Sequence, residues 1–248
     1  MEKIQIIVLA GGKGVRMQNE LPKVLIPLHG KPIITHILDS IKKSGVCDRP
    51  VIVVGQQREL VMKTLGTNYE YIIQEEQLGT GHAVLVTKPF LKNKAENIMV
   101  LNGDMPFIKA DTIKKIFKSH LLERNDMTMG TVRLPDFEGW RRAFYSFGRI
   151  ARDKNGKPER IIYGKNLSQK ELEILEVDPA IFCFRAEWLW PRLDKLENDN
   201  SHSEYYLTDL VGMSISERNL PNMISVLPKE ALGANSKQEL EILESLTV

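Results

Sequence analysis

Residues 9–25 place glycine and cationic side chains directly after an apolar run. The stretch reads LAGGKGVRMQNELPKVL and contains three glycines, two lysines and one arginine. Glycine allows backbone N–H groups to approach phosphate oxygens, and lysine and arginine supply the positive charge that phosphates attract. The alternative interpretation is an ordinary solvent-exposed connection. The residue types favour a phosphate-binding loop.

The spacing of the glycines excludes two common nucleotide-binding motifs. Gly11, Gly12 and Gly14 match neither the G-x-G-x-x-G fingerprint of dinucleotide-binding folds nor the G-K-[ST] ending of a P-loop. In open α/β sheets the loop after the first strand is nevertheless the usual phosphate site. We therefore expect a phosphate-binding loop of a different class.

An acidic residue follows another apolar run. Asp104 comes directly after IMVLNG, within the string NGDMP. At the carboxyl end of a strand a carboxylate can reach a metal ion that bridges phosphates, and Mg²⁺ needs few protein ligands because it keeps several waters. The alternative is that this aspartate only forms a turn. Its position makes it a candidate metal ligand.

The elements that must position these residues follow an alternating pattern. Short β-branched runs predict buried strands, and the amphipathic segments between them predict helices. The best-marked helix has Pro32 at its start and Gly45 just past its end. This alternation indicates βαβ units and a mostly parallel sheet. The expected strands are 4–9, 51–55, 71–74 and 98–101, with further helices over 79–90 and 110–122.

The composition changes after Thr131, where aromatic residues gather around Gly139 and Gly148. Strand-like pieces near 148–151 and 160–163 suggest an inserted β lobe rather than a new domain. We expect one domain over residues 1–248, with this lobe at about 131–185. The elements predicted beyond residue 177 are a strand at 178–184, helices at 187–196 and 205–216, a strand at 223–227 and a helix from Ser236.

Charge, cysteines and histidines narrow the class of protein. With 34 basic and 32 acidic side chains the net charge is +2, so no overall charge draws the protein to nucleic acid or an anionic membrane. Cys47 and Cys183 form no C-x-x-C pair, and the five histidines show no zinc-ligand spacing. The apolar run that ends at Ala10 is too short for a signal sequence or a membrane span. We expect a soluble, cytoplasmic protein.

Several separated strings together resemble one enzyme family. L-A-G-G-x-G-x-R-M followed by L-P-K-V-L resembles the signature of sugar-1-phosphate nucleotidyltransferases. QEEQLGTGHA, from Gln74, and NGDMP, from Asn102, look like the pyrophosphorylase (uridylyltransferase) domain of the bifunctional bacterial enzyme that makes UDP-N-acetylglucosamine. GRI, EYYLTD and GAN, which begin at Gly148, Glu204 and Gly233, extend the match over nearly the whole chain in the right order.

This resemblance implies a fold, an activity and a set of site residues. The fold would be Rossmann-like, with a mostly parallel sheet and helices on both faces. The activity would be transfer of a uridylyl group from UTP to a hexose-1-phosphate, N-acetylglucosamine-1-phosphate or a related sugar, with Mg²⁺ as cofactor. The implied residues are catalytic Arg16 and Lys23; nucleotide-binding Leu9, Ala10, Gly11, Gly12, Gly14, Gln74, Gln77, Gly79 and Thr80; sugar-binding Asn102, Gly103, Gly148, Tyr163 and Asp178; and metal-binding Asp104 and Asn235.

The residues present suit the implied chemistry. In nucleotidyl transfer a sugar-phosphate oxygen attacks the α-phosphorus in line and pyrophosphate leaves, so the barrier is mainly charge and orientation. The attacking phosphate is already ionised near neutral pH, and no general base is needed. The amides of Gln74 and Gln77 each offer a donor and an acceptor, which suits the imide edge of uracil. The alternative for this segment is a polar strand end followed by a helix with Thr80 as its N-cap.

The predicted sugar side departs from the family pattern. YGKN, from Tyr163, stands where the family usually has Glu-x-x-Asp, and DPA, from Asp178, stands where it has Asn-Thr-Gly. An unpaired buried polar group costs on the order of 1–3 kcal/mol, so these changes alter the hydroxyl pattern that is accepted. We expect a hexose-1-phosphate other than N-acetylglucosamine-1-phosphate to be preferred. The aromatic stretch before Gly148 is predicted to pack the lobe, with Arg141 and Arg142 as candidate linings of the acceptor site.

Two alternative functions stay open. One is a nucleotidyltransferase for CTP, dTTP or an alditol phosphate, although QLGTGHA argues against it. The other is a catalytically silent nucleotide-sugar regulator, although a binder has less need of Arg16, Lys23, Asp104 and Asn235. The sequence shows no hexapeptide repeats of a left-handed β-helix, so no acetyltransferase half is expected, and the oligomeric state is open.

Overall fold

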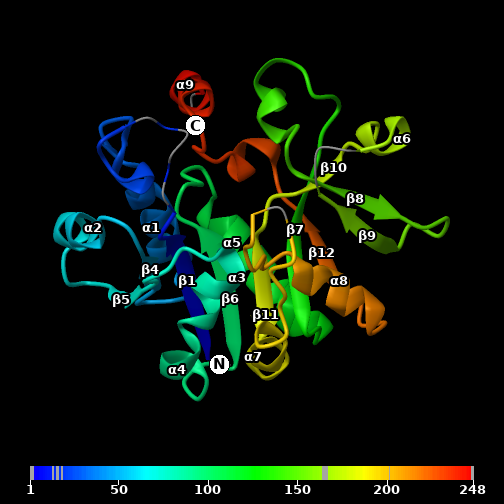
Figure 1. Cartoon of the computed structure of the whole chain (residues 1–248), viewed down its shortest axis with the longest axis horizontal. Helices are drawn as coiled ribbons and strands as arrows, with labels where there is room; N and C mark the ends of the chain where they lie inside the picture. The colour runs from blue at the N-terminus through cyan, green and yellow to red at the C-terminus, as the bar shows by residue number, and fades with distance from the viewer. Residues whose placement is uncertain are drawn as a thin grey trace.

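A mixed sheet runs through the computed structural model, which describes residues 3–12, 14, 17, 19–163, 167–200 and 202–246. The strand order is β5-β4-β1-β6-β11-β7-β10-β8-β9, with β12 paired to β7 (Figure 1). β2 and β3 form a separate small sheet. The strands are β1 (Ile4–Ala10), β2 (Pro27–Leu28), β3 (Lys31–Pro32), β4 (Val51–Val54), β5 (Glu70–Ile73), β6 (Asn97–Asn102), β7 (Met127–Arg133), β8 (Gly148–Arg152), β9 (Pro158–Ile162), β10 (Glu176–Asp178), β11 (Phe182–Arg185) and β12 (Asn222–Ser225).

The first half of the chain builds the parallel part of the sheet. β1 pairs in parallel with β4 on one side and with β6 on the other, and β5 continues the row beyond β4. The strands β1, β4 and β6 are rich in fully buried aliphatic residues because helices cover both faces. The four strands predicted here are confirmed, each to within one residue at either end.

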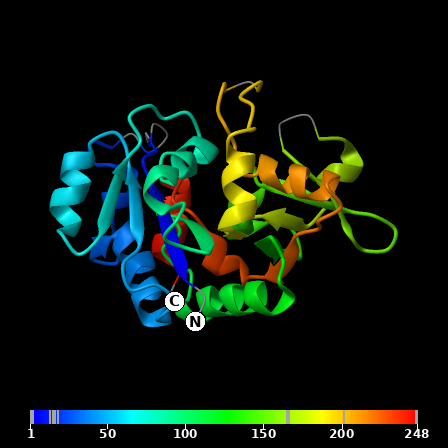
Figure 2. The ribbon, with the colours of Figure 1, turned by 90° about the horizontal axis from the view of Figure 1, so that it is seen from below.

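Helices pack on both faces of this sheet, as predicted. Side chains alternate along β1, so Ile6 and Val8 join one hydrophobic cluster and Ile7 joins the other. Figure 2 shows α5 on one side and α7 and α8 on the opposite side. One cluster includes residues of α1 (Ile33–Ser44), α2 (Arg58–Leu65), α5 (Ala110–Glu123) and α9 (Lys237–Ser245); the other includes residues of α3 (Thr80–Leu85), α4 (Lys88–Leu91), α7 (Ala186–Leu193) and α8 (Asp209–Ser216).

The second half of the chain adds antiparallel strands. β11 runs antiparallel between β6 and β7, and β12 lies parallel to β7. β10 pairs antiparallel with both β7 and β8, and β8 forms a hairpin with β9. In Figure 1 β8, β9, β10 and the short helix α6 (Gln169–Leu172) lie at one end of the sheet. The β pieces predicted near 148–151 and 160–163 are therefore confirmed.

Two predicted helices have different boundaries. The helix expected over 79–90 is two helices, α3 and α4, because Pro89 lies in the first turn of α4 and lacks the N–H that a continuous helix needs. The helix expected over 205–216 begins only at Asp209, and residues 205–208 form a connection. None of the helices in the part of the chain that the structure describes is long and apolar enough to cross a membrane.

The strand expected over 178–184 is interrupted. Asp178 Oδ1 accepts a hydrogen bond of 2.7 Å from the Ala180 N–H, and Ala180 has φ +57°, so the chain turns between β10 and β11. The sequence analysis also missed α2 and β7. Val61 is the one described residue of α2 that is buried, and β7 contains Gly130 in its middle, so neither element has a strong pattern.

Candidate active site

The carboxyl ends of the parallel strands bring the predicted Gly11 and Gly103 to one edge of the sheet, together with Gly55, which was not singled out from the sequence. β1 ends between β4 and β6. A Cβ added to Gly55 would lie 2.6 Å from the Gly11 carbonyl oxygen, and one added to Gly103 would lie 2.9 Å from the carbonyl oxygen of Leu9. Gly103 also donates its N–H to Leu9 at 2.9 Å. Glycine is needed for such close approaches, and it joins the loops after β1, β4 and β6 into one edge.

The predicted phosphate loop leaves this edge, just past Ala10. A Cβ placed on Gly12 would meet no atom of the described residues within 4 Å. Gly14 has φ +59°, and its Cβ would lie 3.1 Å from Lys23 Cβ, so Gly14 lies against the start of the short helix η2 (Lys23–Leu25). Arg16, the other predicted catalytic residue, lies outside the described residues.

Lys23 meets both predicted metal ligands. Its Nζ lies 2.5 Å from Asp104 Oδ2 and 3.0 Å from Asn235 Oδ1. The side chains of Lys23 and Asp104 are 17% and 10% exposed, so this ion pair is largely shielded from water. Three residues from distant parts of the chain thus converge beside the edge formed by Gly11, Gly55 and Gly103, here called the glycine edge.

The two oxygen atoms suit a cation. Asp104 Oδ2 and Asn235 Oδ1 contact the same ammonium, so one positive centre can reach both, and carboxylate and amide oxygens are ligands that Mg²⁺ takes with water completing its shell. A Cβ on Gly233 would lie 3.2 Å from Asn235 Nδ2 and 3.3 Å from Asp104 Oδ2, so glycine keeps this corner open. Within the described ranges no group of three or more His, Cys, Asp or Glu side chains is arranged to hold a metal. The candidate ligand set is one carboxylate and one amide.

The two predicted base-reading glutamines follow β5. Gln74 is buried, and its Nε2 donates to the Gly79 carbonyl oxygen at 3.1 Å and lies 3.1 Å from His82 Nδ1. Gln77 Nε2 donates to the Gln74 carbonyl oxygen at 2.9 Å. Gln74 therefore shapes the loop, while Gln77 lines a cavity of about 440 Å³. The remaining lining residues are Gly55, Gln56, Gln57, Arg58, Glu59 and Glu75.

Thr80 has a partner that the sequence did not predict. The N-cap of α3 is Gly79, with φ +101°, so the interpretation of Thr80 as N-cap is wrong. The Thr80 hydroxyl instead accepts a hydrogen bond of 3.0 Å from the N–H of Leu207. The helix start needs φ > 0 at its cap, which glycine adopts without strain.

The two residues that depart from the family pattern contact each other. The Tyr163 hydroxyl donates to Asp178 Oδ2 at 2.6 Å. The ring lies directly over Gly148, whose Cβ would be 2.2 Å from Tyr163 Cε1. The residue is 45% exposed, whereas its hydroxyl is enclosed. Gly148 therefore makes room for an aromatic platform.

Burial controls the ionisation of this pair. Complete burial raises the pKa of Asp178 to about 6, while hydrogen bonds from Tyr163 and the Ala180 N–H act in the opposite direction. Burial and the neighbouring carboxylate raise the pKa of Tyr163 well above its ordinary value. The phenol is thus the donor, and Asp178 is only 4% exposed, so Tyr163 is the more accessible residue of the pair.

Asn102 lies between Asp178 and the candidate metal ligand Asp104. It ends β6, two residues before Asp104, and its Nδ2 donates to the Ala180 carbonyl oxygen at 3.5 Å. Ala180 in turn donates its N–H to Asp178. The predicted sugar-binding and metal-binding residues therefore lie along one continuous edge.

The aromatic stretch before Gly148 is packed by an arginine that the sequence analysis did not single out. Phe144, at the end of the short helix η3 (Gly139–Phe144), is fully buried. The buried guanidinium of Arg149 donates to the carbonyl oxygens of Phe147 at 2.7 Å, Tyr145 at 2.9 Å and Phe144 at 3.3 Å, and stacks 4.3 Å from the Phe137 ring centre. The prediction that this stretch packs the lobe is confirmed for Phe144.

Arg141 has a local partner. It forms two hydrogen bonds of 2.7 Å with the carboxylate of Asp136, which neutralise its charge within the same stretch. Backbone and side-chain hydrogen bonds to Asp136 lower the pKa of that carboxyl.

An α/β sheet with a glycine edge and a lysine, a carboxylate and an amide converging beside it has the features of a nucleotide-phosphate site. Residues 6–207 match a known family, and the chain belongs to the family of MobA-like NTP transferase domains. The family match and the curated relatives confirm the predicted resemblance to sugar-1-phosphate nucleotidyltransferases and to the pyrophosphorylase half of the bifunctional enzyme.

Curated relatives match nearly the whole chain. Proteins named bifunctional protein GlmU are 39% identical over 241 residues in Clostridium beijerinckii, 36% over 244 in Desulfotalea psychrophila and 37% over 246 in Brevibacillus brevis. The matches cover 97%, 97% and 99% of this chain and 51%, 69% and 52% of the relatives. The chain thus spans about half the length of two of these relatives.

Solved structures share the fold. A protein described as a glucose-1-phosphate thymidylyltransferase from Bacillus anthracis, in complex with sucrose, superposes with a TM-score of 0.77 at 17% identity, covering 99% of this chain and 97% of its own. HddC from Yersinia pseudotuberculosis, complexed with GMP-PN, gives a TM-score of 0.66 at 16% identity, covering 98% of each chain. The predicted fold class is confirmed.

Proposed function

We propose that the protein transfers a uridylyl group from UTP to a hexose-1-phosphate and releases pyrophosphate. The observation that carries the proposal is the convergence of Lys23, Asp104 and Asn235 beside the glycine edge. Such a cluster provides both a positive charge for phosphates and oxygen ligands for the metal that accompanies a triphosphate. The family membership and the string QEEQLGTGHA support a nucleotidyl transfer with uracil as the base.

In this proposal the loop after β5 binds the base. Gln77 lines the 440 Å³ cavity beside Gly55, and Gln74 holds the loop in shape through the Gly79 carbonyl oxygen. Uracil presents an N–H donor between two carbonyl acceptors, which glutamine amides and the backbone of Gly79 and Thr80 can complement. Cytosine reverses part of this pattern and would leave one polar group unmatched.

The reaction itself needs orientation and charge. A phosphate oxygen of the sugar phosphate forms a bond to the α-phosphorus of UTP, the bond from that phosphorus to the β-phosphate oxygen breaks, and pyrophosphate leaves with the electron pair. The nucleophile is already ionised, so no side chain has to remove a proton. Lys23 and Arg16 would neutralise the phosphates, and the glycine edge would donate backbone N–H groups to them.

Asp104 and Asn235 would hold Mg²⁺ in this proposal. A bound Mg²⁺ neutralises charge on the phosphates between which the bond breaks. Lys23, now paired with Asp104, would be available to the phosphate oxygens. The chain thus supplies an oxygen pair for the ion and an ammonium beside it.

The acceptor site would lie over Tyr163, in a lobe of about residues 131–185 within one domain. The exposed ring surface offers an apolar contact to the C–H face of a sugar ring, while the hydroxyl is already engaged with Asp178. A carboxylate at this position would accept sugar hydroxyls, whereas a phenol that donates to Asp178 keeps little capacity for them. We therefore propose a hexose-1-phosphate other than N-acetylglucosamine-1-phosphate as the preferred acceptor.

A matrix of pyrophosphate-release assays tests the function. UTP, CTP, dTTP, ATP and GTP are each combined with glucose-1-phosphate, galactose-1-phosphate, glucosamine-1-phosphate and N-acetylglucosamine-1-phosphate in the presence of Mg²⁺. We expect release with UTP and at least one hexose-1-phosphate. Release with another nucleotide alone would refute the uridylyl assignment, and no release in any combination would favour the silent regulator.

A further inference from the structure

Residues 204–208, here called the strap, lie along the end of the loop after β5 (residues 74–80, here called the base loop) and the start of α3. The Tyr205 N–H donates to the Leu78 carbonyl oxygen at 2.8 Å, and the Gly81 N–H donates to the Tyr205 carbonyl oxygen at 2.7 Å. A Cβ on Gly79 would lie 2.5 Å from that same Tyr205 oxygen. The strap and the base loop therefore pack backbone against backbone, with no side chain between them.

The Thr80 hydroxyl adds a third attachment. It accepts the hydrogen bond from Leu207 N–H across 127 positions of sequence. Leu207 is buried, so its N–H depends on this protein partner and not on water. The hydroxyl of Thr80 thus faces the strap, whereas the proposed contact of this residue with the base uses its backbone.

The strap leads directly to the acceptor pocket. Thr208 and Asp209, at the start of α8, lie next to the hydroxyl of Tyr163. Figure 1 shows α8 running beside β9, the strand that precedes Tyr163. A displacement of the strap would therefore move the groups that surround the Tyr163 hydroxyl.

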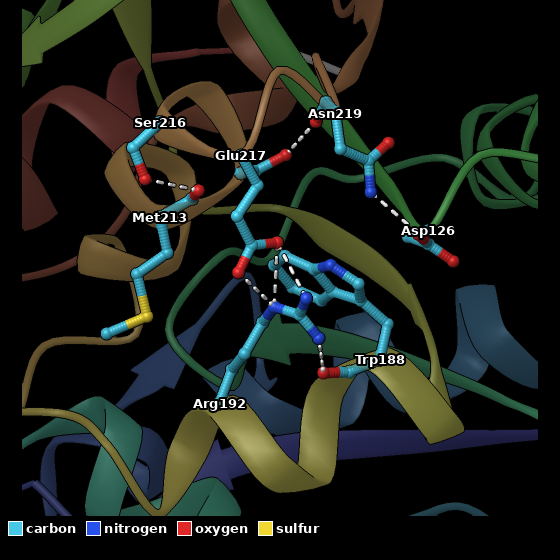
Figure 3. Close-up of polar contacts among 8 residues, drawn as sticks. Asp126, Trp188, Arg192, Met213, Ser216, Glu217 and Asn219 are labelled. Atoms are coloured by element: carbon cyan, nitrogen blue, oxygen red, sulfur yellow. Dashed lines mark hydrogen bonds and ion pairs between the residues drawn. The ribbon is translucent and has the colours of Figure 1, made fainter.

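The far end of α8 is fixed to α7. Figure 3 shows the Arg192 guanidinium bound to the carboxylate of Glu217, with Nη2–Oε2 at 2.6 Å and Nε–Oε1 at 3.0 Å. The same guanidinium stacks 4.3 Å from the ring centre of Trp188 and donates to its carbonyl oxygen at 3.0 Å. The strap precedes the other end of α8, which begins at Asp209.

We propose that Thr80 is a positioning residue for the acceptor pocket, acting through Leu207 and the start of α8 on Tyr163. The inference rests on the proposed function, because it assigns the base to the loop that carries Thr80 and the sugar to the surface of Tyr163. It has an unusual consequence. A side chain in the base loop controls binding of the other substrate.

The test is the KM for each substrate in three variants of the full chain. Thr80→Val keeps the shape of the side chain but removes the hydroxyl oxygen that accepts the hydrogen bond from Leu207 N–H. Loss of one hydrogen bond changes an equilibrium constant on the order of fivefold. We expect the KM for the sugar phosphate to rise about fivefold or more, with the KM for UTP changed less than about twofold. Thr80→Ser should restore both. Thr87→Val is the matched control, because Thr87 is buried and its hydroxyl donates within its own segment, to Val84.

Three outcomes would overturn the inference: a rise in the KM for UTP alone, an equal rise in both KM values, or no change in either. If Thr80→Val does not fold, Asn200→Ala loosens the strap from its other side, since Asn200 Nδ2 donates to the Glu204 carbonyl oxygen at 2.6 Å. It should give the same selective rise. Should the wild-type protein release no pyrophosphate at all, the proposed function has failed, while faster hydrogen exchange at Leu207 in Thr80→Val would still report the attachment.

Discussion

The buried contact between Tyr163 and Asp178 should make the free energy of unfolding depend on pH. Asp178 is completely enclosed, and burial raises its pKa from the ordinary 3.8 to about 6. A difference of about 2 pH units corresponds to about 3 kcal/mol, at roughly 1.4 kcal/mol per unit. This is a large fraction of the free energy of unfolding of a typical domain, which is roughly 5–15 kcal/mol.

The direction in which stability changes with pH follows from proton binding by Asp178. The native state holds the Asp178 proton more tightly than the unfolded chain, so the contribution of Asp178 to the free energy of unfolding is highest below pH 3.8 and decreases as the pH rises through about 6. Above that pH the loss is complete and constant. Tyr163 stays protonated throughout, because its pKa lies well above its ordinary value. Asp209, whose pKa burial also raises, is present in both proteins that are compared.

Asp178→Asn removes the titrating group while keeping its size. The free energy of unfolding of both proteins is measured in urea from pH 4.5 to 8. Relative to wild type, the variant should become more stable as the pH rises, by most of the difference of about 3 kcal/mol, and the difference should be constant above pH 7. Tyr163→Phe removes a hydrogen bond that lowers the pKa of Asp178, so in that background the transition should move to higher pH. A difference between wild type and Asp178→Asn that stays constant over the whole range would refute the reasoning.

Three further predictions concern catalysis. Asp104→Asn should lower kcat about a hundredfold or more, measured by pyrophosphate release across a Mg²⁺ titration, because a main electrostatic stabiliser is weakened; an unchanged rate would place the metal elsewhere. UTP should be preferred over CTP by roughly ten- to a hundredfold in kcat/KM through Gln74 and Gln77, and equal values would contradict the uracil assignment. Tyr163→Glu combined with Asp178→Asn should shift acceptor preference toward N-acetylglucosamine-1-phosphate; a wild type that already prefers this sugar more than tenfold over the other hexose-1-phosphates would show that the two substitutions do not set specificity.

The parallel half of the fold could be predicted because its signals are local. α1 carries its apolar face, a proline before it and Gly45 with φ +61° after it within a dozen or so residues. β7 was missed because its central Gly130 is accommodated by contacts with Ile181 and Val226, both far away in sequence. A pattern within one segment cannot report such a neighbour.

The candidate site shows the same division. Lys23, Asp104 and Asn235 were identified from short strings, and the structure places their side chains in contact across 81 and 212 positions. The contact between Tyr163 and Asp178 was not predicted, because it depends on how β8, β9 and β10 pair. Likewise the contact of the Thr80 hydroxyl depends on residues 205–208, which were predicted as the start of a helix and instead form a connection.

The position of β11 in the sheet has a consequence for synthesis on the ribosome. β6 ends at Asn102, but its outer neighbour β11 begins at Phe182, so the nascent chain carries one unpaired edge of β6 for about 4 to 16 s at about 5 to 20 residues per second. An apolar strand edge without a partner is a template for aggregation, and β6 is buried along almost its whole length in the folded protein. The site is completed later still, when Asn235 reaches Lys23. The nascent chain is therefore open to chaperone binding and to misassembly well before the site of its proposed chemistry is complete.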